Sequence, residues 1–455
     1  MRIHFRHPAA ANTRNSLIIS LTLVMNGRYF QIRETAFFYM RIKSPAYLVI
    51  GLLSWSIGQQ LGAAEGVRTL PDSAAGMGMI GGRLANMLDP SVTRANPASL
   101  PLLRESALMI TAGPWHGKTD FNGVDGSSET MIEPWKPLGS MYYVRPVSEN
   151  VTVGIGFAAP FGLSMSWPRD GPFRYYAPYE AVLQTAALNP AVGFKLNDRV
   201  SIGVGLDVFY SRLELSQDYP WALAAGTPVP DGDMNFEGDG WGFGGYMGIN
   251  FKLAEHHRLA LVGRLPVNVG YNGDFSISDV PAALSGVFLP DTGFKTDIEH
   301  PASIGIGYGV DLTDKLTLGI DCEWIQNSAH DDLPLNIGSN QPLLPVDRLD
   351  LDWRDSYSVG CGLQYQLTPA WVLRAGYLFS KSPLRDRTYT PVIPTNDRHI
   401  FSAGVGYTRG RHTFDLAYSF VPMETRTVRE ASTPAFNGDY EIEWQVFTAS
   451  YTLRF

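Results

Sequence analysis

Hydrophobic and polar residues alternate along the last segment of the chain. Its apolar members lie two residues apart, at Phe447, Ala449, Tyr451 and Leu453, and the chain ends at Phe455. Side chains on a strand point alternately to its two faces, so the pattern predicts a final β-strand with one apolar and one polar face. Such a strand suits either a soluble β-domain or a membrane β-barrel.

The same alternation recurs after residue 100, and the predicted connections sort by length. Short polar turns are predicted at 147–150, 196–199, 254–257, 312–315, 367–370 and 408–411. Long connections are predicted at 114–137, 161–180, 218–233, 275–292, 327–350, 382–396 and 422–440. Short and long connections alternate, which predicts fourteen strands. An even strand count with short turns on one side and long loops on the other is typical of a transmembrane antiparallel β-barrel.

The faces of four strands can be assigned from their polarity. Each carries apolar residues on one face and charge on the other: Asp311 in 304–312, Asp321 and Glu323 in 316–324, Arg374 in 371–379 and Asp415 in 412–420. A charge on the lipid face near the membrane midplane costs about 2–4 kcal/mol, so the charged face must line the lumen. The opposite residues, such as Ile304, Ile306 and the other apolar positions, are predicted to face lipid.

Residues 65–103 do not have the alternating pattern of a barrel strand. They are rich in Gly and Ala, are interrupted by Pro90 and Pro97, and carry one weak helical stripe at Leu84, Met87 and Leu88. The wall residues of a fourteen-stranded barrel are too far apart to fill its lumen. We therefore predict that this segment is a compact hatch inside the barrel, which itself spans residues 104–455; a flexible linker is the alternative.

Composition agrees with a membrane barrel and argues against several other classes. The chain has 455 residues, a mean hydropathy of −0.06 and a formal charge of −8. Membrane barrels have an average composition because only every second strand residue faces lipid. The acidic balance argues against a nucleic-acid partner. The two cysteines, Cys322 and Cys361, are too few for a disulfide framework or a zinc site.

The amino-terminal region resembles a secretory signal that does not start at residue 1. Residues 40–64 combine Arg41 and Lys43 with an apolar run from Ala46 to Ile57 and end in small residues. This order is typical of a signal peptide, and the run is too short to span a membrane. We expect residues 1–39 to be an upstream extension, with an unusually long leader as the alternative, and the mature chain to begin near Glu65.

Several short motifs, taken in their order, resemble one protein family. The hatch segment contains Gly76-Met77-Gly78, Gly81-Gly82, Asp89 and Asn96-Pro97-Ala98 followed by Leu100. The carboxy-terminal half contains Trp353-Arg354-Asp355, WVLRAGY from Trp371, Ser382-Pro383, Pro394 before Asp397-Arg398, and Gly404-Val405-Gly406-Tyr407. Together these resemble the FadL/TodX family of outer-membrane channels for hydrophobic compounds, across about residues 65–455.

The resemblance implies the function and the partners. It implies a monomer in the outer membrane of a Gram-negative cell that takes up hydrophobic molecules passively, with long-chain fatty acids as the first candidate and aromatic or alkane hydrocarbons as the alternative. The implied partners are the ligand, outer-membrane lipid and lipopolysaccharide, and the barrel assembly machinery, to which the terminal Phe455 resembles a signal. It implies no cofactor. A structural barrel or adhesin is the alternative from another class, and a polar porin fits poorly with a hatch.

Two arginines match positions where the fatty-acid channels carry a basic residue near the ligand carboxylate. Arg354 is in phase with Ser356 and Ser358, so it is predicted to face the lumen. Arg212 on the fifth strand reaches the lumen only if a bulge lies near Phe209–Ser211, because the apolar positions before and after it differ in parity. A guanidinium can hold a carboxylate through two parallel hydrogen bonds. Ion pairs with lumenal carboxylates are the alternative role.

The third strand is the candidate gate. Gly154, Gly156 and Pro160 weaken its pairing, and the family uses a kink there as a sideways exit. Asn96, presented by Pro97 and Ala98, is expected to hydrogen-bond the backbone left unpaired at the kink, since unpaired groups are costly next to lipid. A glycine-rich strand that only accommodates the hatch is the alternative.

Nothing in the sequence indicates catalysis or a metal site. Asp231, Asp233, Asp239 and the run His330-Asp331-Asp332 fall in predicted external loops, and no complete calcium-binding loop is present. Neither His256-His257 nor His412 has a serine partner of the kind a membrane phospholipase needs. We therefore expect a protein that is not an enzyme.

Overall fold

The computed structural model describes residues 22–25, 28–31, 68–132, 135–329, 331–344 and 348–455. The chain divides into two compact units, Met1–Trp55 and Ser56–Phe455. In the first unit β1 (Thr22–Met25) pairs antiparallel with β2 (Arg28–Gln31). The predicted signal peptide, residues 40–64, and its cleavage position near Glu65 lie outside the described residues.

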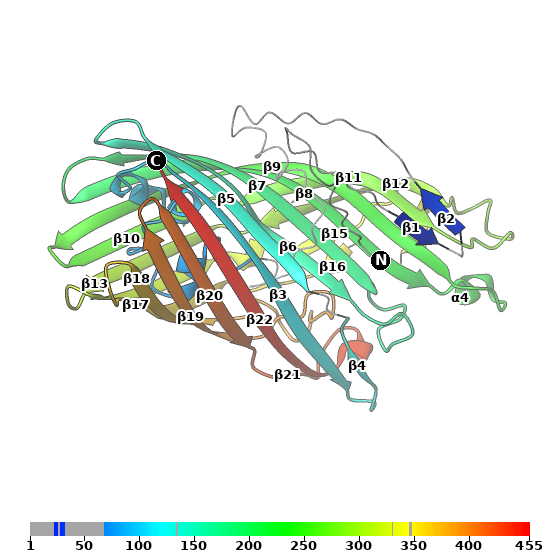
Figure 1. Cartoon of the computed structure of the whole chain (residues 1–455). Coiled ribbons are helices and arrows are strands. Elements are labelled where there is room, and N and C mark those ends of the chain that lie inside the picture. The colour runs from blue at the N-terminus through cyan, green and yellow to red at the C-terminus, as the bar shows by residue number, and fades with distance from the viewer. Residues whose placement is uncertain (1–21, 26–27, 32–67, 133–134, 330, 345–347) are drawn as a thin grey trace. The chain divides into compact units, whose positions relative to one another are not determined.

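The second unit is a closed antiparallel barrel of fourteen strands, as the alternation of the sequence predicts (Figure 1). Ten of its elements are β3 (Ala107–Gly123), β5 (Lys136–Pro146), β6 (Val151–Ser166), β7 (Glu180–Lys195), β8 (Val200–Tyr219), β9 (Gly232–Ala254), β10 (His257–Arg264), β11 (Val267–Ile277), β12 (Asp291–His300) and β13 (Ser303–Asp311). The rest are β14 (Leu316–Ile325), β17 (Ser356–Gln366), β18 (Trp371–Ser380), β19 (Arg398–Arg409), β20 (His412–Pro422) and β22 (Gly438–Arg454). The predicted last strand, β22, closes the barrel by pairing with β3.

Two of the fourteen strands are interrupted by prolines. Pro266 separates β10 from β11 and Pro301 separates β12 from β13, so each pair of elements forms one crossing of the barrel. Proline cannot donate to the ladder, which accounts for both breaks. The buried side chains change parity across each break, from Val262 to Val267 and from His300 to Ser303.

The connections alternate in length around the barrel, as predicted. The short ones are tight turns between consecutive strands, and the long ones contain the remaining elements: β4 (Ser128–Thr130), α4 (Trp221–Ala225), η2 (Asn327–Ala329), β15 (Asp332–Pro334), η3 (Gly338–Leu343), β16 (Arg348–Asp350), β21 (Arg426–Val428) and η4 (Pro434–Phe436). Several strands extend further into the long loops than predicted, with β8 reaching Tyr219. No helix within the described residues is long and apolar enough to cross a membrane.

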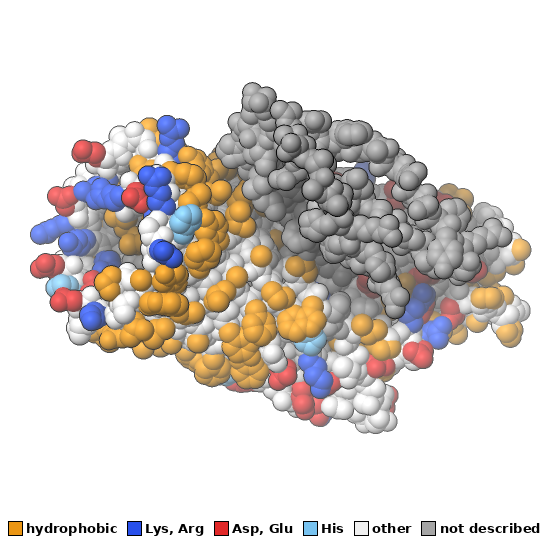
Figure 2. Space-filling view, in the orientation of Figure 1, with side chains coloured by type: hydrophobic (Ala, Val, Ile, Leu, Met, Phe, Trp, Pro, Cys, Tyr) orange, Lys and Arg blue, Asp and Glu red, His pale blue; other side chains and the backbone are white. Residues whose placement is uncertain are grey.

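The apolar residues assigned to the lipid face are exposed on the outer wall. Ile304 and Ile306 are 50% and 49% exposed, whereas the charged side chain of Asp321 on the opposite parity is 7% exposed. Figure 2 shows apolar side chains over the middle of the barrel and charged ones gathered toward its ends. Cys322 and Cys361 are both free and exposed.

Residues 68–103 fold as short helices and turns against the inner wall: α2 (Ala74–Gly78), α3 (Val92–Ala95) and η1 (Pro97–Leu102). Their backbone touches the wall directly because both sides use glycine. A Cβ built on Gly81, whose φ is +81°, would lie 2.3 Å from the carbonyl oxygen of Tyr377 and 2.7 Å from the amide of Cys361. Gly82 meets Gly319 and Gly362 in the same way.

Candidate functional site

The barrel wall has a gap between the second and third strands. β5 and β6 pair from Pro146 and Thr152 up to Met141 and Phe157, and their described residues form no further ladder pair beyond that point. On its other side β6 pairs with β7, but the register shifts between Ala158 and Phe161, around Pro160. We call the region bounded by residues 137–140 of β5 and 158–163 of β6 the wall gap.

The wall gap closes again toward the long loops. The amide of Ile132 donates to the carbonyl of Ser166 over 2.7 Å, which rejoins the two sides. Lys136 Nζ donates to the carbonyl of Ser164, and the Lys136 side chain is buried, 5.4 Å from the ring centroid of Trp115. The opening is therefore bounded above and below by paired backbone.

Residues 68–72 of the hatch, which we call the sealing segment, lie along the inside of the wall gap. The amide of Thr69 donates to the carbonyl of Pro160 over 2.9 Å, and Thr69 Oγ1 donates to the carbonyl of Ala159 over 2.7 Å. On the β5 side, Ser140 Oγ donates to the carbonyl of Asp72 over 2.6 Å. The segment thus supplies polar partners where the wall lacks them, as a site facing lipid requires.

Partly buried charge pairs anchor both ends of the sealing segment. Arg68 forms two parallel hydrogen bonds of 2.9 Å with Glu323 of β14. Asp72 pairs with Arg94 of α3 over 2.9 Å and accepts from the hydroxyl of Tyr142 over 2.9 Å. Burial works against the charge of both arginines, but the adjacent carboxylates outweigh it and raise the pKa of Arg68 and of Arg94.

Asn96 does not hold the wall gap, so that expectation is wrong. Its Nδ2 donates to the carbonyl of Leu84 and to Oδ1 of Asn250 in β9, over 2.9 and 2.8 Å, and its Oδ1 accepts from the amide of Ala98. Pro97 and Ala98 likewise pack on the glycines and Ser201 of the wall beyond β6. Asn96 caps η1 and fixes it to β9.

Gly154 and Gly156 do not form the kink either. Both pair regularly with β5 and with β7. A Cβ on Gly154 would lie 2.5 Å from Thr93 Oγ1 of the hatch, and one on Gly156 would lie 2.4 Å from the Tyr142 ring. Gly154 makes room for the hatch, as the alternative interpretation proposed, whereas Gly156 makes room for Tyr142 of β5. The register break with β7 is confined to Ala159 and Pro160.

Above the hatch the lumen is lined by a large set of buried apolar side chains, which we call the outer lumen cluster. Its members come from most strands and long loops and include Phe121, Met165, Trp167, Phe173, Leu213, Leu215, Phe236, Tyr271, Phe275, Phe294 and Tyr440. Phe161, at the edge of the wall gap, stacks on His300 with ring centroids 4.2 Å apart, and Phe209 packs on both. An apolar surface therefore runs continuously from the loops to the wall gap.

Arg212 lies on the outside of the barrel, so its predicted orientation is wrong. β8 pairs with β9 in one unbroken register from Val200 to Tyr219, and the expected bulge is absent from it. Arg212 is exposed and forms ion pairs with Glu237, over 2.7 Å, and with Glu214. Leu213 and Leu215, which were expected to face lipid, are buried in the outer lumen cluster.

Arg354 also fails to reach the lumen. The strand that would give it an inward phase, β17, begins only at Ser356, and Arg354 is exposed in the preceding connection. Its Nη2 donates to the carbonyl of Leu384 over 3.2 Å. The two arginines are therefore not brought together, and neither belongs to the outer lumen cluster.

The acidic residues of the external loops are used in ion pairs. Asp231 pairs with Arg174 over 2.6 Å and accepts from the hydroxyl of Tyr175, and Asp233 accepts from the hydroxyl of Tyr179. His330 lies outside the described residues. Among the residues that the structure does describe, no group of three or more potential ligands could hold a metal ion.

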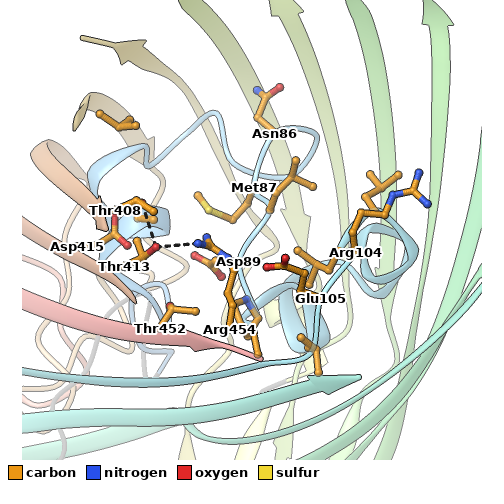
Figure 3. A pocket seen from close by; sticks show the side chains of 18 of the residues that line it. Asn86, Met87, Asp89, Arg104, Glu105, Thr408, Thr413, Asp415, Thr452 and Arg454 are labelled. Carbon is orange, nitrogen blue, oxygen red and sulfur yellow. Dashed lines mark hydrogen bonds between the residues drawn. The ribbon is translucent and has the colours of Figure 1, made fainter. Parts of the chain in front are cut away.

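At the end of the short turns, the hatch and the wall line a vestibule of about 450 Å³ that combines charged and apolar side chains (Figure 3). Asp89, Glu105, Asp415 and Arg454 point toward its interior, and Arg454 donates to Thr413 over 3.1 Å. Arg374 pairs with Asp415 over 2.7 Å. Charged walls stabilise water and not an apolar solute, so this end of the lumen does not continue the apolar surface above the hatch.

Sequence reasoning missed the sealing segment and Lys136. Thr69 and Asp72 lie in irregular backbone without periodicity, and their roles depend on contacts with strands about 70 to 90 residues away. Lys136 could have been identified, because its even position matches the buried Ser140 and Tyr142 of β5.

Comparisons with known proteins agree with this architecture. Residues 56–455 match the family described as outer membrane protein transport protein (OMPP1/FadL/TodX). An outer membrane protein of Neisseria meningitidis serogroup B is 28% identical over 390 residues, covering 76% of this chain and 84% of the relative. The long-chain fatty acid transport protein of Salmonella typhi is 24% identical over 434 residues, covering 88% of this chain and 93% of the relative. The crystal structure of a Pseudomonas aeruginosa FadL homologue superimposes with a TM-score of 0.76 at 20% identity, covering 85% of this chain and 99% of that one.

Proposed function

Because the chain belongs to the OMPP1/FadL/TodX family of outer-membrane transport proteins for hydrophobic compounds, we propose that it takes up long-chain fatty acids and releases them sideways through the wall gap. The single observation that carries the lateral route is the missing ladder between β5 and β6, sealed from inside by Thr69. The relatives named as long-chain fatty acid transport proteins support the substrate class.

The barrier that the outer membrane presents to apolar solutes explains why the exit would be lateral. The saccharide leaflet of the outer membrane excludes apolar solutes, and a water-filled pore offers them no binding energy. The outer lumen cluster supplies an apolar surface from the loops down to Phe161. The way straight through passes charged side chains, since Arg374, Asp415 and Arg454 line the vestibule below the hatch. Exit into the bilayer moves the substrate down its gradient without an energy source.

A hydrocarbon substrate is the second candidate, and one observation favours it. Arg212 and Arg354, which would have bound a carboxylate, lie outside the lumenal surface. Their role in ligand binding stays untested, but an aromatic or alkane molecule would need neither. A structural barrel or adhesin would show no ligand binding at all.

Uptake of labelled fatty acid distinguishes these possibilities. Cells that lack their own fatty-acid channel should accumulate labelled hexadecanoate when they express this protein. A variant in which the wall gap is closed should assemble in the outer membrane but not support uptake. Accumulation of toluene or an alkane without accumulation of hexadecanoate would select the hydrocarbon candidate, and accumulation of neither would leave a structural role.

We also propose the processing and the partners that the sequence indicates. Cleavage after Ala64 would leave a mature chain of the hatch, residues 65–103, and the barrel, residues 104–455. Assembly would depend on Phe455 at the end of β22, and the barrel would work as a monomer among lipid and lipopolysaccharide. Mass spectrometry of the outer-membrane form tests the cleavage: a peptide from before residue 40 would contradict it.

A further inference from the structure

An apolar groove of about 500 Å³, which we call the outer groove, lies on the outer wall close to the wall gap. Three residues from each of β3, β22, β20 and β19 line it, and these strands lie side by side in the barrel (Figure 1). The lining consists of Ala, Gly, Pro, Val, Leu, Phe, Tyr and Thr, so it offers mainly apolar contacts. A water molecule needs roughly 10–15 Å³ on the same measure. The outer groove therefore has room for several consecutive methylene groups.

The outer groove exists because small side chains lie between larger ones. Ala112 of β3 and Ala449 of β22 are directly paired, and both are exposed on the outer wall. Along β22, an aromatic pair flanks Ala449 on each side: Phe447–Tyr418 toward the long loops and Tyr451–Phe414 toward the short turns. Their ring centroids are 4.9 and 5.0 Å apart. The two alanines thus form the floor of a groove between two aromatic ridges.

This floor continues into the wall gap. Ala112 pairs with Gly139 of β5, an exposed residue at the edge of the wall gap. Extending the β5–β6 register by two residues beyond its last pair brings Gly139 opposite Ala159 of β6. One row of small residues therefore crosses the wall from Ala159 in the gap, through Gly139 and Ala112, to Ala449.

The wall is thin between the outer groove and the sealing segment. Gly113 and Thr448 line the outer groove and also a cavity of about 20 Å³ on the inner side, which Thr69 and Ala159 line as well. The β3–β22 ladder is interrupted at the same place, at Gly113 and Pro114. A chain that passes the sealing segment therefore meets the outer groove directly outside the wall gap.

From this continuity we propose that the outer groove receives the acyl chain of the fatty acid as it leaves the wall gap and guides it along the wall into the bilayer. The inference rests on the proposed lateral uptake and adds the path that follows the exit. A phospholipid chain is anchored at the membrane surface, whereas a chain leaving the gap enters the row of small residues from its end, at Ala159 and Gly139. Dispersion contacts with the floor and the ridges are individually weak and add along the chain.

Filling the outer groove tests this path. Ala112→Leu and Ala449→Leu each place a larger apolar side chain on the floor, which lipid tolerates, so the barrel should assemble. Each variant should lower the initial rate of hexadecanoate uptake by about fivefold or more, because the chain loses contacts and space next to the gap. Cys322→Leu makes a similar change at an exposed position of β14 outside the outer groove and should keep the rate within about twofold.

Photolabelling distinguishes the substrate from membrane lipid as the occupant. One probe is hexadecanoate with a diazirine near its chain end, added outside intact cells that express the protein and cannot activate fatty acids. The other is a phosphatidylethanolamine whose hexadecanoyl chain carries the same diazirine, incorporated into outer-membrane vesicles. The peptide that contains Ala449 is compared by mass spectrometry with the outer-wall peptide that contains Ile320 of β14. The free acid should label the Ala449 peptide about fivefold more strongly, and the phospholipid should label both about equally.

Three results would overturn the outer groove as the exit path. They are equal labelling of the two peptides by the free acid, preferential labelling of the Ala449 peptide by the phospholipid, and unchanged uptake in both Leu variants. In each of these cases wild-type cells still accumulate hexadecanoate, so the proposed function survives. Wild-type cells that accumulate no hexadecanoate would contradict the proposed function itself, and the exit path would fail with it.

Discussion

The amide of Thr69 donates a 2.9 Å hydrogen bond to the carbonyl of Pro160, so the hatch pairs with the wall where the wall does not pair with itself. The neighbouring residues Arg68 and Phe161 are bridge partners in the same antiparallel arrangement. The sealing segment is thus a short additional strand on the inside of the wall gap. Any lateral exit between β5 and β6 requires this segment to move.

A reversible cross-link tests that requirement. Residues directly opposite in an antiparallel pair have Cα atoms about 4.5–5.5 Å apart, which a disulfide can bridge. We expect a Thr69→Cys/Pro160→Cys variant to lose hexadecanoate uptake when oxidised and to regain it when reduced. The native Cys322 and Cys361 are free and exposed, so both are first replaced by Ala.

The single variants Thr69→Cys and Pro160→Cys are the controls for the cross-link. Each single variant should show the same hexadecanoate uptake in oxidising and in reducing conditions. Uptake that continues with the disulfide formed would show that substrate leaves by another route.

The exposed position of Arg212 leads to a second prediction. Arg212→Ala removes ion pairs with Glu214 and Glu237 on the outer surface, where a pair contributes about 0–1 kcal/mol to stability. We expect hexadecanoate affinity and the free energy of unfolding to stay nearly unchanged. A tenfold loss of affinity in Arg212→Ala would restore the carboxylate role that the sequence suggested.

The error at Arg212 shows how far polarity can be interpreted from the sequence. In the lower part of β8 the apolar residues Val204 and Leu206 face lipid, and in the upper part Leu213 and Leu215 face the lumen. The parity of the strand does not change; the surroundings do, because above the membrane the outside is water and the inside is apolar. A sequence-based interpretation that equates apolar with outward must then invoke a bulge that does not exist.

The strands and their order were predictable for a physical reason, and the contacts of the hatch were not. Alternation and turn chemistry are local, so the faces of residues such as Ile304 and Asp415 follow from a few neighbours. The site depends on Thr69 meeting Pro160 and on Arg68 meeting Glu323, which are 91 and 255 residues apart in sequence. Neither contact leaves a periodic signal in irregular backbone.

Asn96 carries a third prediction, because it is 1% exposed and fully bonded. Replacing it with Ala leaves the carbonyl of Leu84 and Oδ1 of Asn250 without this donor, which should destabilise the docked hatch by about 1–3 kcal/mol. Hydrogen exchange of the amides between Leu84 and Leu100 should become faster, whereas the strands should keep their protection. Asn122→Ala, at an exposed position on β3, is the control and should leave the exchange unchanged.

The same variant tests the gate role first expected of Asn96. Since Asn96 bonds to β9 and not to the wall gap, we expect uptake to change only as far as the hatch loosens. Reduced uptake with unchanged hydrogen exchange would return Asn96 to the gate.

Gly81 provides the last prediction, on what keeps the lumen closed to polar solutes. Its φ of +81° is the left-handed conformation, in which any other residue is strained by about 1–2 kcal/mol. In addition, a Cβ there would lie 2.3 Å from the carbonyl oxygen of Tyr377 and 2.7 Å from the amide nitrogen of Cys361. Both atoms belong to wall strands and cannot move without breaking the ladder, so Gly81→Ala should push the hatch away from the wall and raise single-channel conductance in a planar bilayer.

Gly126→Ala separates the backbone strain from the clash with the wall, because Gly126 has a φ of +86° but nothing within 4 Å of its built Cβ. It should carry the strain without the clash and leave the conductance at the wild-type value; equal conductance in all three proteins would mean that the hatch does not depend on this contact with the wall.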